Sequence, residues 1–144
     1  MNSVSITYTP EDEWHGELAA KLRGGKFTGR GSAWFNVSEL LEFARSIGTF
    51  PIEASSALLL EGGYWNDEGT LDQVHFRMKI KPVGKRGMLS ASVHLSATEN
   101  STDSSGEIRV EFPVTYGDLA NFQSSLLNHL NGHAAEATLE QSRS

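Results

Sequence analysis

The sequence contains no cysteine and no long apolar run, and each absence excludes a class of protein. Without cysteine the chain can form no disulfide, no thiolate metal site and no cysteine nucleophile. No apolar stretch approaches the roughly 18 residues that a membrane-spanning helix needs. The first residues carry neither the basic segment nor the apolar segment of a secretory signal. We therefore expect a cytoplasmic protein without a membrane partner.

Positive charge is also scarce, because 12 lysines and arginines stand against 18 aspartates and glutamates, for a net charge of −6. This balance argues against nucleic acid as the main partner, since neutralisation of phosphates dominates that affinity. Most of the cations fall in two windows, 21–30 and 77–86. Such windows could contact a phosphate or an acidic partner, although an outer sheet face with cross-strand ion pairs is the commoner explanation.

The clearest structural signal is a strict alternation of apolar and polar residues on either side of 84–87. Apolar residues from Val74 to Ile80 share one parity, and those from Leu89 to Ala97 do the same. Alternation with a period of two predicts two strands, each with one buried face. The glycines of the intervening turn suit a tight connection, so we expect a long antiparallel hairpin over 71–98.

Other segments carry the same alternation or a short apolar run, and we expect strands there as well. They are 3–8, 14–23, 26–35, 57–61 and 107–112. Segments 62–69 and 100–106 are rich in glycine or polar residues, which predicts loops. One face of the 26–35 strand consists mostly of Gly and Ala, so a bulky element, most simply a helix, is expected to pack against it.

Two segments have the caps and the apolar stripe of amphipathic helices. Asn36 precedes Glu39 in a capping-box arrangement, and Thr115 precedes Asp118 in the same way. Gly132 ends the second helix. The predicted buried stripes are Leu40, Phe43, Ala44 and Ile47 in the first helix and Leu119, Phe122, Leu126 and Leu130 in the second.

These elements follow the order βββα and then ββββα. The order predicts an α+β protein with a single antiparallel sheet of about six to seven strands and two helices packed on one face. Residues 1–132 are expected to form one domain, and 133–144 a polar, disordered tail. The helix at 36–47 also aligns without gaps with the helix at 115–126. This similarity indicates either an internal duplication or the usual appearance of a capped amphipathic helix after a strand.

The segment from 61 to 72 combines carboxylates, aromatic residues and glycines, as many binding loops do. Such a loop can bind a sugar, a cation or a basic protein surface, and paired carboxylates can perform acid–base catalysis. Alternatively, its Trp and Tyr side chains only cover the end of the core. We predict no catalytic residue. The candidate binding residues are Glu61, Tyr64, Trp65, Asp67, Glu68, Asp72 and His75.

Motifs for metals and nucleotides are incomplete. His129 and His133 have the spacing of a zinc-binding helix, but no glutamate lies between them and Gly132 breaks the helix. The glycine- and lysine-rich segment 23–31 lacks the spacing of a P-loop. We therefore predict no metal and no cofactor. A small-ligand-binding protein or a hydrolase that uses 61–72 is the alternative to a non-catalytic binding protein.

One longer pattern resembles a known family. The segment Phe27–Ala44, followed by Leu60-Glu-Gly-Gly-Tyr-Trp65, resembles small uncharacterised bacterial proteins with the order strand, acid-capped helix and glycine–aromatic loop. These proteins are similar to the immunity proteins of polymorphic toxin systems, such as the wall-associated-protein immunity family. The similarity covers roughly the first two thirds of the chain and includes no catalytic motif.

This resemblance implies a cytoplasmic, non-catalytic protein that binds and blocks a cognate toxin. The acidic net charge suits a basic toxin such as a nuclease, because complementary charge speeds encounter and selects partners. A homodimer, formed through an edge strand or across the open face of the sheet, is a third hypothesis.

Overall fold

The computed structural model describes residues 2–99 and 104–142, and within them the chain forms eight strands and two helices. The first half contains β1 (Ser3–Pro10), β2 (His15–Gly24), β3 (Phe27–Asn36), α1 (Val37–Ser46), the short 3₁₀ turn η1 (Ala54–Ser56) and β4 (Leu58–Trp65). The second half contains β5 (Leu71–Val83), β6 (Met88–Glu99), β7 (Ser104–Val114), α2 (Tyr116–Leu130) and β8 (Ala137–Glu140). The predicted central hairpin is confirmed by β5 and β6, and two glycines of its turn have positive φ.

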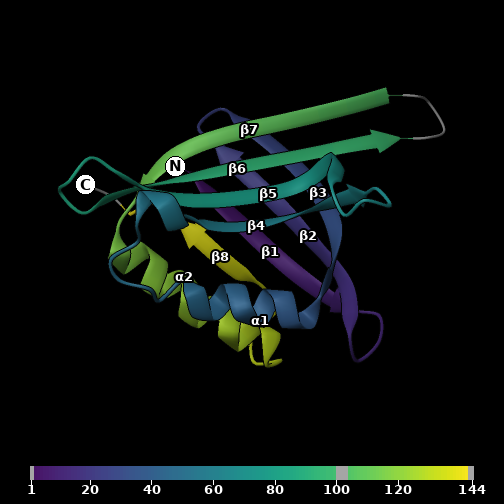
Figure 1. Ribbon diagram of the computed structural model, residues 1–144, viewed down its shortest axis with the longest axis horizontal. Helices are drawn as coiled ribbons and strands as arrows, with labels where there is room; N and C mark the ends of the chain where they lie inside the picture. Colours follow the sequence, from purple (N-terminus) through teal and green to yellow (C-terminus); the bar gives the residue numbers. More distant parts are fainter. Residues whose placement is uncertain (1, 100–103, 143–144) are drawn as a thin grey trace.

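The strands form two antiparallel sheets. Sheet A has the order β3-β2-β1-β8, and sheet B has the order β4-β5-β6-β7. The protein is α+β, as predicted, but the prediction of a single sheet was wrong. Alternation tells which face a residue occupies, and it carries no information about which strands pair. Here α1 separates β3 from β4, and the two strands join different sheets (Figure 1).

The glycine-rich face of β3 packs against sheet B, where a helix had been expected. A Cβ atom at Gly29 would lie 2.5 Å from Cγ2 of Ile108, and one at Gly31 would lie 3.1 Å from Cβ of Leu95. The missing side chains therefore make room for those of β6 and β7. Figure 1 shows the strands of sheet A crossing behind those of sheet B, and this close approach lets the two sheets share one core.

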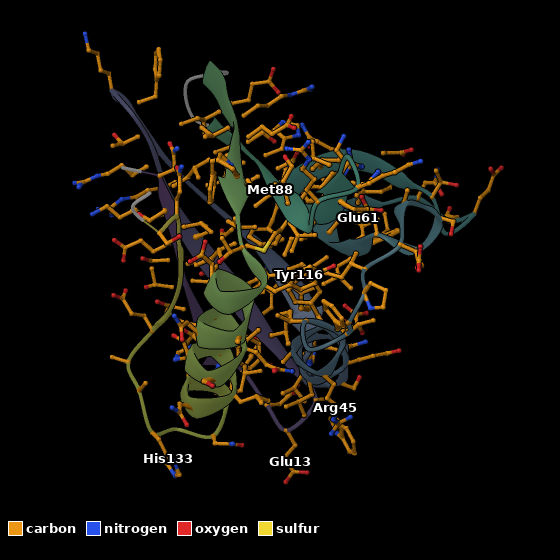
Figure 2. All side chains as sticks on the ribbon, turned by 90° about the vertical axis from the view of Figure 1, so that its left-hand side faces the viewer. Glu13, Arg45, Glu61, Met88, Tyr116 and His133 are labelled. Atoms are coloured by element: carbon orange, nitrogen blue, oxygen red, sulfur yellow. The ribbon has the colours of Figure 1, made fainter. Side chains whose placement is uncertain are left out.

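The two helices lie side by side and close the core where the sheets diverge. Figure 2 shows them in the lower half of the molecule, with Arg45 on α1 and Tyr116 at the start of α2. The side chain of Gln123 donates a 2.9 Å hydrogen bond from Nε2 to the carbonyl oxygen of Ala44, which links the helices. All predicted stripe residues are buried except Leu130, which is partly buried. In the part of the chain that the structure describes, neither helix is long and apolar enough to cross a membrane.

Three segment predictions need correction. The predicted disordered tail contains β8, which pairs with β1, although only two apolar residues alternate there and the period is too short to recognise. The strand expected over 57–61 extends to Trp65, so the predicted loop is reduced to a turn. Strand β7 begins at Ser104, and 100–103 of the predicted connector lie outside the described residues.

The chain order repeats in space. In each half, three strands form a meander in one sheet, a helix follows, and the last strand of that half joins the other sheet. Strand β4 pairs with β5, the first strand of the second half, and β8 pairs with β1, the first strand of the first half. The alignment of the two helices is thus accompanied by a repeated topology, which favours the interpretation as a duplication.

Candidate functional site

The candidate residues from the sequence lie on the hairpin formed by β4 and β5. Glu61, Tyr64 and Trp65 belong to β4, and Asp72 and His75 belong to β5. The turn between the strands is organised by an asparagine, Asn66, whose Oδ1 accepts hydrogen bonds from the backbone N–H groups of Glu68 and Thr70, both 2.9 Å. Asp67 and Glu68 are at the tip of this turn. The residues therefore have fixed positions on a hairpin.

The four carboxylates of this hairpin do not converge. The Nε of Arg77 donates to Oε2 of Glu61 at 2.7 Å, and Asn66 donates to Oδ1 of Asp72 at 2.9 Å. Among the candidate residues, Tyr64 and His75 contact one another, with ring centroids 4.7 Å apart in an edge-to-face arrangement. In residues 2–99 and 104–142 no group of three or more His, Asp or Glu side chains could hold a metal ion.

Several large aromatic side chains are exposed, on this hairpin and on other elements. The three tryptophans of the chain, Trp14, Trp34 and Trp65, are 71%, 54% and 54% exposed, and Tyr64 is 62% exposed. The core is built instead from Phe, Leu, Ile, Val, Met and Ala. The sequence analysis did not select Trp14 or Trp34. For Trp34 a signal existed, because its parity in the strand is that of the polar residues Arg30 and Ser32.

Strand register and helix position bring these aromatics together with acids. Glu17 is the cross-strand partner of Trp34, and the carbonyl oxygen of Trp14 accepts a 2.7 Å hydrogen bond from Val37 N, at the start of α1. Trp65 shares a groove of about 420 Å³ with acids of α1. We call this region the acidic–aromatic surface, and define it as Trp14, Glu17, Trp34, Glu39, Glu42, Tyr64 and Trp65. Figure 1 shows the β1–β2 turn, the start of α1 and the β4–β5 turn on the same right-hand side.

The turn that presents Trp14 is held by a carboxylate. Oδ1 of Asp12 accepts hydrogen bonds from the backbone N–H of Trp14 at 2.7 Å and of His15 at 2.9 Å. It also lies 2.7 Å from Nδ1 of His15. These backbone hydrogen bonds, followed by the contact with the His15 side chain, lower the pKa of Asp12. The charged carboxylate therefore fixes the backbone on either side of Trp14.

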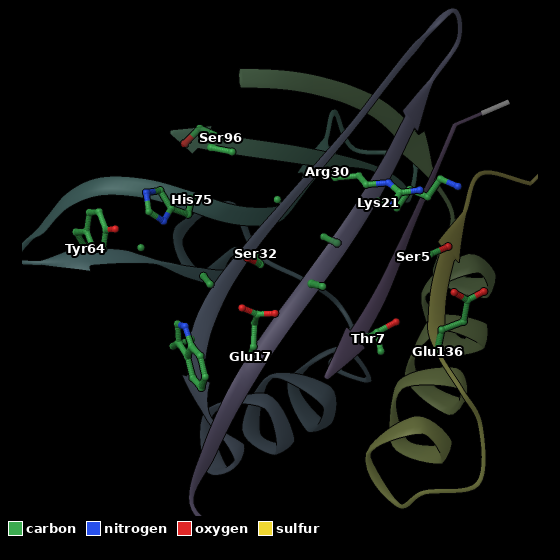
Figure 3. A pocket seen from close by; sticks show the side chains of 17 residues that line it. Ser5, Thr7, Glu17, Lys21, Arg30, Ser32, Tyr64, His75, Ser96 and Glu136 are labelled. Atoms are coloured by element: carbon green, nitrogen blue, oxygen red, sulfur yellow. The ribbon is translucent and has the colours of Figure 1, made fainter. Parts of the chain in front are cut away.

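A second feature is an open groove of about 780 Å³ on the outer side of sheet A. Figure 3 shows Tyr64 and His75 at one end of it and Lys21 and Arg30 at the other. Glu17 and the hydroxyl groups of several serines and threonines line the floor between them. The lining therefore combines polar side chains with alanines and glycines, with an aromatic pair at one end and two cations at the other.

His129, one of the two histidines at metal-like spacing, has a structural position. Its Nε2 accepts a 2.8 Å hydrogen bond from the backbone N–H of Tyr8, and its Nδ1 donates to the carbonyl oxygen of Ala134 at 2.9 Å. This pattern fixes the tautomer with the proton on Nδ1. The imidazole thus ties the end of α2 to β1.

Comparison of the chain with protein-family models, with curated proteins and with solved structures finds no match in any of the three.

Proposed function

We propose that this protein is a non-catalytic binding protein whose acidic–aromatic surface docks onto a basic surface of another protein. The observation that carries the proposal is the position of the tryptophans. All three are at least half exposed. Trp34 lies opposite Glu17 of β2, and Trp65 lines a groove with Glu39 and Glu42 of α1. Tryptophan and tyrosine are the residues most enriched among those that dominate binding energy at protein interfaces.

The surface is already ordered before a partner binds. Trp14 is held through Asp12, Trp34 lies within a paired strand, and Tyr64 is packed edge-on against His75. Ordering of side chains and loops is a major cost of association, so a pre-ordered surface loses less free energy on binding. The backbones that carry these aromatic side chains are therefore held in place, and a few such side chains can supply most of the affinity.

Charge selects the class of partner. Glu17, Glu39 and Glu42 surround the aromatics, and none of them forms an ion pair within the described residues. The net charge of −6 adds a long-range field of the same sign. Such a field attracts a basic surface and raises the rate of encounter. An immunity-type protein that blocks a basic toxin domain, for example a nuclease, fits this charge and the absence of a convergent catalytic group among the described residues.

The proposal is tested by co-expressing the tagged protein with the products of its neighbouring genes and measuring affinity by calorimetry. We expect one stoichiometric basic partner, and a loss of affinity of about a hundredfold or more in the double variant Tyr64→Ala, Trp65→Ala. Phe27→Ala is the matched control, because Phe27 is 71% exposed but lies at the distant β2–β3 turn. It should bind like the wild type. Affinity should also fall as salt increases.

Two results would contradict the proposal. An equal loss of affinity in Phe27→Ala and in the double variant would mean that the aromatics of the acidic–aromatic surface have no special role. A second copy of the same chain as the bound partner, seen by light scattering and lost in the double variant, would replace the toxin by a homodimer. Circular dichroism of each variant shows whether the fold is retained.

A further inference from the structure

The cations at the end of the sheet A groove occupy an unusual position. Lys21 on β2 and Arg30 on β3 are direct cross-strand partners, and both side chains point outward from the sheet. Like charges directly opposite each other destabilise a sheet. The next residues in the same row are Ser5 on β1 and Thr138 on β8, which bear no charge. In the part of the chain that the structure describes, neither cation forms an ion pair.

The repeated topology supplies a comparison within the same molecule. Arg30 and Arg109 lie at the same distance before the helix caps Asn36 and Thr115. The cross-strand partner of Arg109 is His94, which therefore corresponds to Lys21. The cross-strand partners continue in the same way across the next two strands. In sheet B they are Arg77 and then Glu61, and in sheet A they are Ser5 and then Thr138. Both sheets thus have a basic pair in the same place on their outer faces.

In sheet B that row is neutralised by two glutamates. Glu61 pairs with Arg77 at 2.7 Å. Glu107 pairs with His94 at 2.9 Å and lies 3.7 Å from Nη2 of Arg109. The residue at the position of Glu107 in sheet A is Thr28, and the residue at the position of Glu61 is Thr138. Sheet A therefore has two cations in this row and threonine hydroxyls at the positions where sheet B has its two glutamates.

We infer that Lys21 and Arg30 form a binding site for the oxyanion of a small ligand, a carboxylate or a phosphate, which takes the place of the missing glutamates. The guanidinium group provides paired donors for either group, and the ammonium provides a point charge. Ser5 adds a hydroxyl, which is 3.1 Å from that of Thr138. Figure 3 shows the two cations next to each other beside Ser5.

The remainder of the groove limits the ligand. Its volume of about 780 Å³ is within the range of small-molecule sites. Glu17 and Glu136 also line it, on the side away from the cations in Figure 3. A polyanion laid along the groove would meet these carboxylates, so a ligand with one anionic group fits best. The groove shares Glu17, Trp34 and Tyr64 with the acidic–aromatic surface, but the two cations that bind the oxyanion, Lys21 and Arg30, are outside that surface.

The inference is tested by NMR titration of the whole protein with inorganic phosphate and, in a separate arm, with acetate, both at constant ionic strength. Saturable shifts are expected for the backbone amides of Ser5, Lys21 and Arg30. Arg30→Gln should weaken binding about tenfold or more, because it removes a charge-assisted hydrogen bond. Arg109→Gln removes the same charge from the corresponding place in sheet B, and its affinity should stay within about twofold of the wild type. Saturation in only one arm identifies the oxyanion.

A gain-of-charge variant provides the decisive control. Thr28→Glu restores the carboxylate that sheet B has at Glu107, at an exposed position where folding is not at risk. It should abolish anion binding and raise the thermal midpoint, whereas Thr28→Gln should do neither. The inference is overturned if no amide in the groove saturates, if both arginine variants lose affinity equally, or if Thr28→Glu binds phosphate as the wild type does. The single variant Trp65→Ala lies outside the groove lining, so it should retain anion binding even where it weakens binding of the protein partner.

Discussion

Sheets A and B have the same strand layout, but they differ in whether the charged side chains on their outer faces have ion-pair partners. On sheet B, Arg77 and His94 of one outward-facing row have glutamate partners within 3 Å. On sheet A, Lys21 and Arg30 face each other without a carboxylate partner in the described residues. The same row therefore appears in both sheets, with carboxylate partners in sheet B and without them in the described residues of sheet A. The comparison separates residues that hold the fold from residues free to bind.

The inner faces of the two sheets differ in the size of their side chains. Strand β3 presents glycine where β7, at the corresponding position before the helix, presents Ile108. A small face on one sheet and a large face on the other allow the backbones to approach closely. Two identical faces would either clash or leave a void.

The largest expected effect comes from removing this difference. Gly29→Val would place a side chain against Ile108, where even a Cβ would lie 2.5 Å from Cγ2. We expect a loss of about 2 kcal/mol in the free energy of unfolding, measured with urea. Adding Ile108→Ala should recover part of it, because the space opens again. Thr28→Val, on the exposed face of the same strand, is the control. A destabilisation that Ile108→Ala leaves unchanged would show that the clash is not with this residue.

The N-terminal caps of the two helices also differ between the halves, and removing them should have a smaller effect on stability. Thr115 forms a complete capping box, in which its hydroxyl accepts from Asp118 N at 3.0 Å and Asp118 accepts from Thr115 N at 2.9 Å. Asn36 makes no side-chain capping bond, against the prediction from the sequence. Thr115→Ala should therefore cost about 1 kcal/mol, and Asn36→Ala less than about 0.5 kcal/mol, by urea unfolding. Equal costs would mean that the two caps work alike in solution.

The smallest effect concerns the first turn of each half. Asp12 holds the β1–β2 turn by hydrogen bonds, whereas the corresponding β5–β6 turn relies on Gly84 and Gly87 at positive φ. Because the pKa of Asp12 is lowered in the folded protein, its contribution is fully present above the ordinary value of 3.8 and is lost as the pH falls below it. The stability difference between the wild type and Asp12→Asn should therefore shrink below about pH 4. Parallel stability curves across that range would contradict this role.

The sequence predicted most elements of the fold, and it failed on how they associate. Alternation and caps located the hairpin of 71–98 and both helical stripes, because these signals are local. The division into two sheets depends on which strands meet, and the packing of Gly29 against Ile108 joins residues far apart in the chain. Strand β8 has too few residues to show a period, so its place beside β1 could not be read from the sequence.

The candidate site was predictable to a similar extent. Tyr64 and His75 were selected from composition and do line a groove together. The two basic windows were also recognised, but cross-strand ion pairs were the commoner explanation for both. Arg77 does form such a pair, with Glu61 on the neighbouring strand. Lys21 faces Arg30 instead of an acid. The sequence could not show this difference, because it does not specify which residues of neighbouring strands face each other.

The exchange of last strands between the halves has a consequence for how the protein is made. Within the described residues, β1 is a free edge of sheet A unless β8, the most C-terminal of the described strands, pairs with it. While the chain is still being synthesised, β1 to β3 are available but the free edge of β1 has no partner. Exposed strand edges invite association with other chains. A nascent chain therefore carries an open sheet edge until β8 has left the ribosome, and a truncation before residue 137 would leave that edge permanently open.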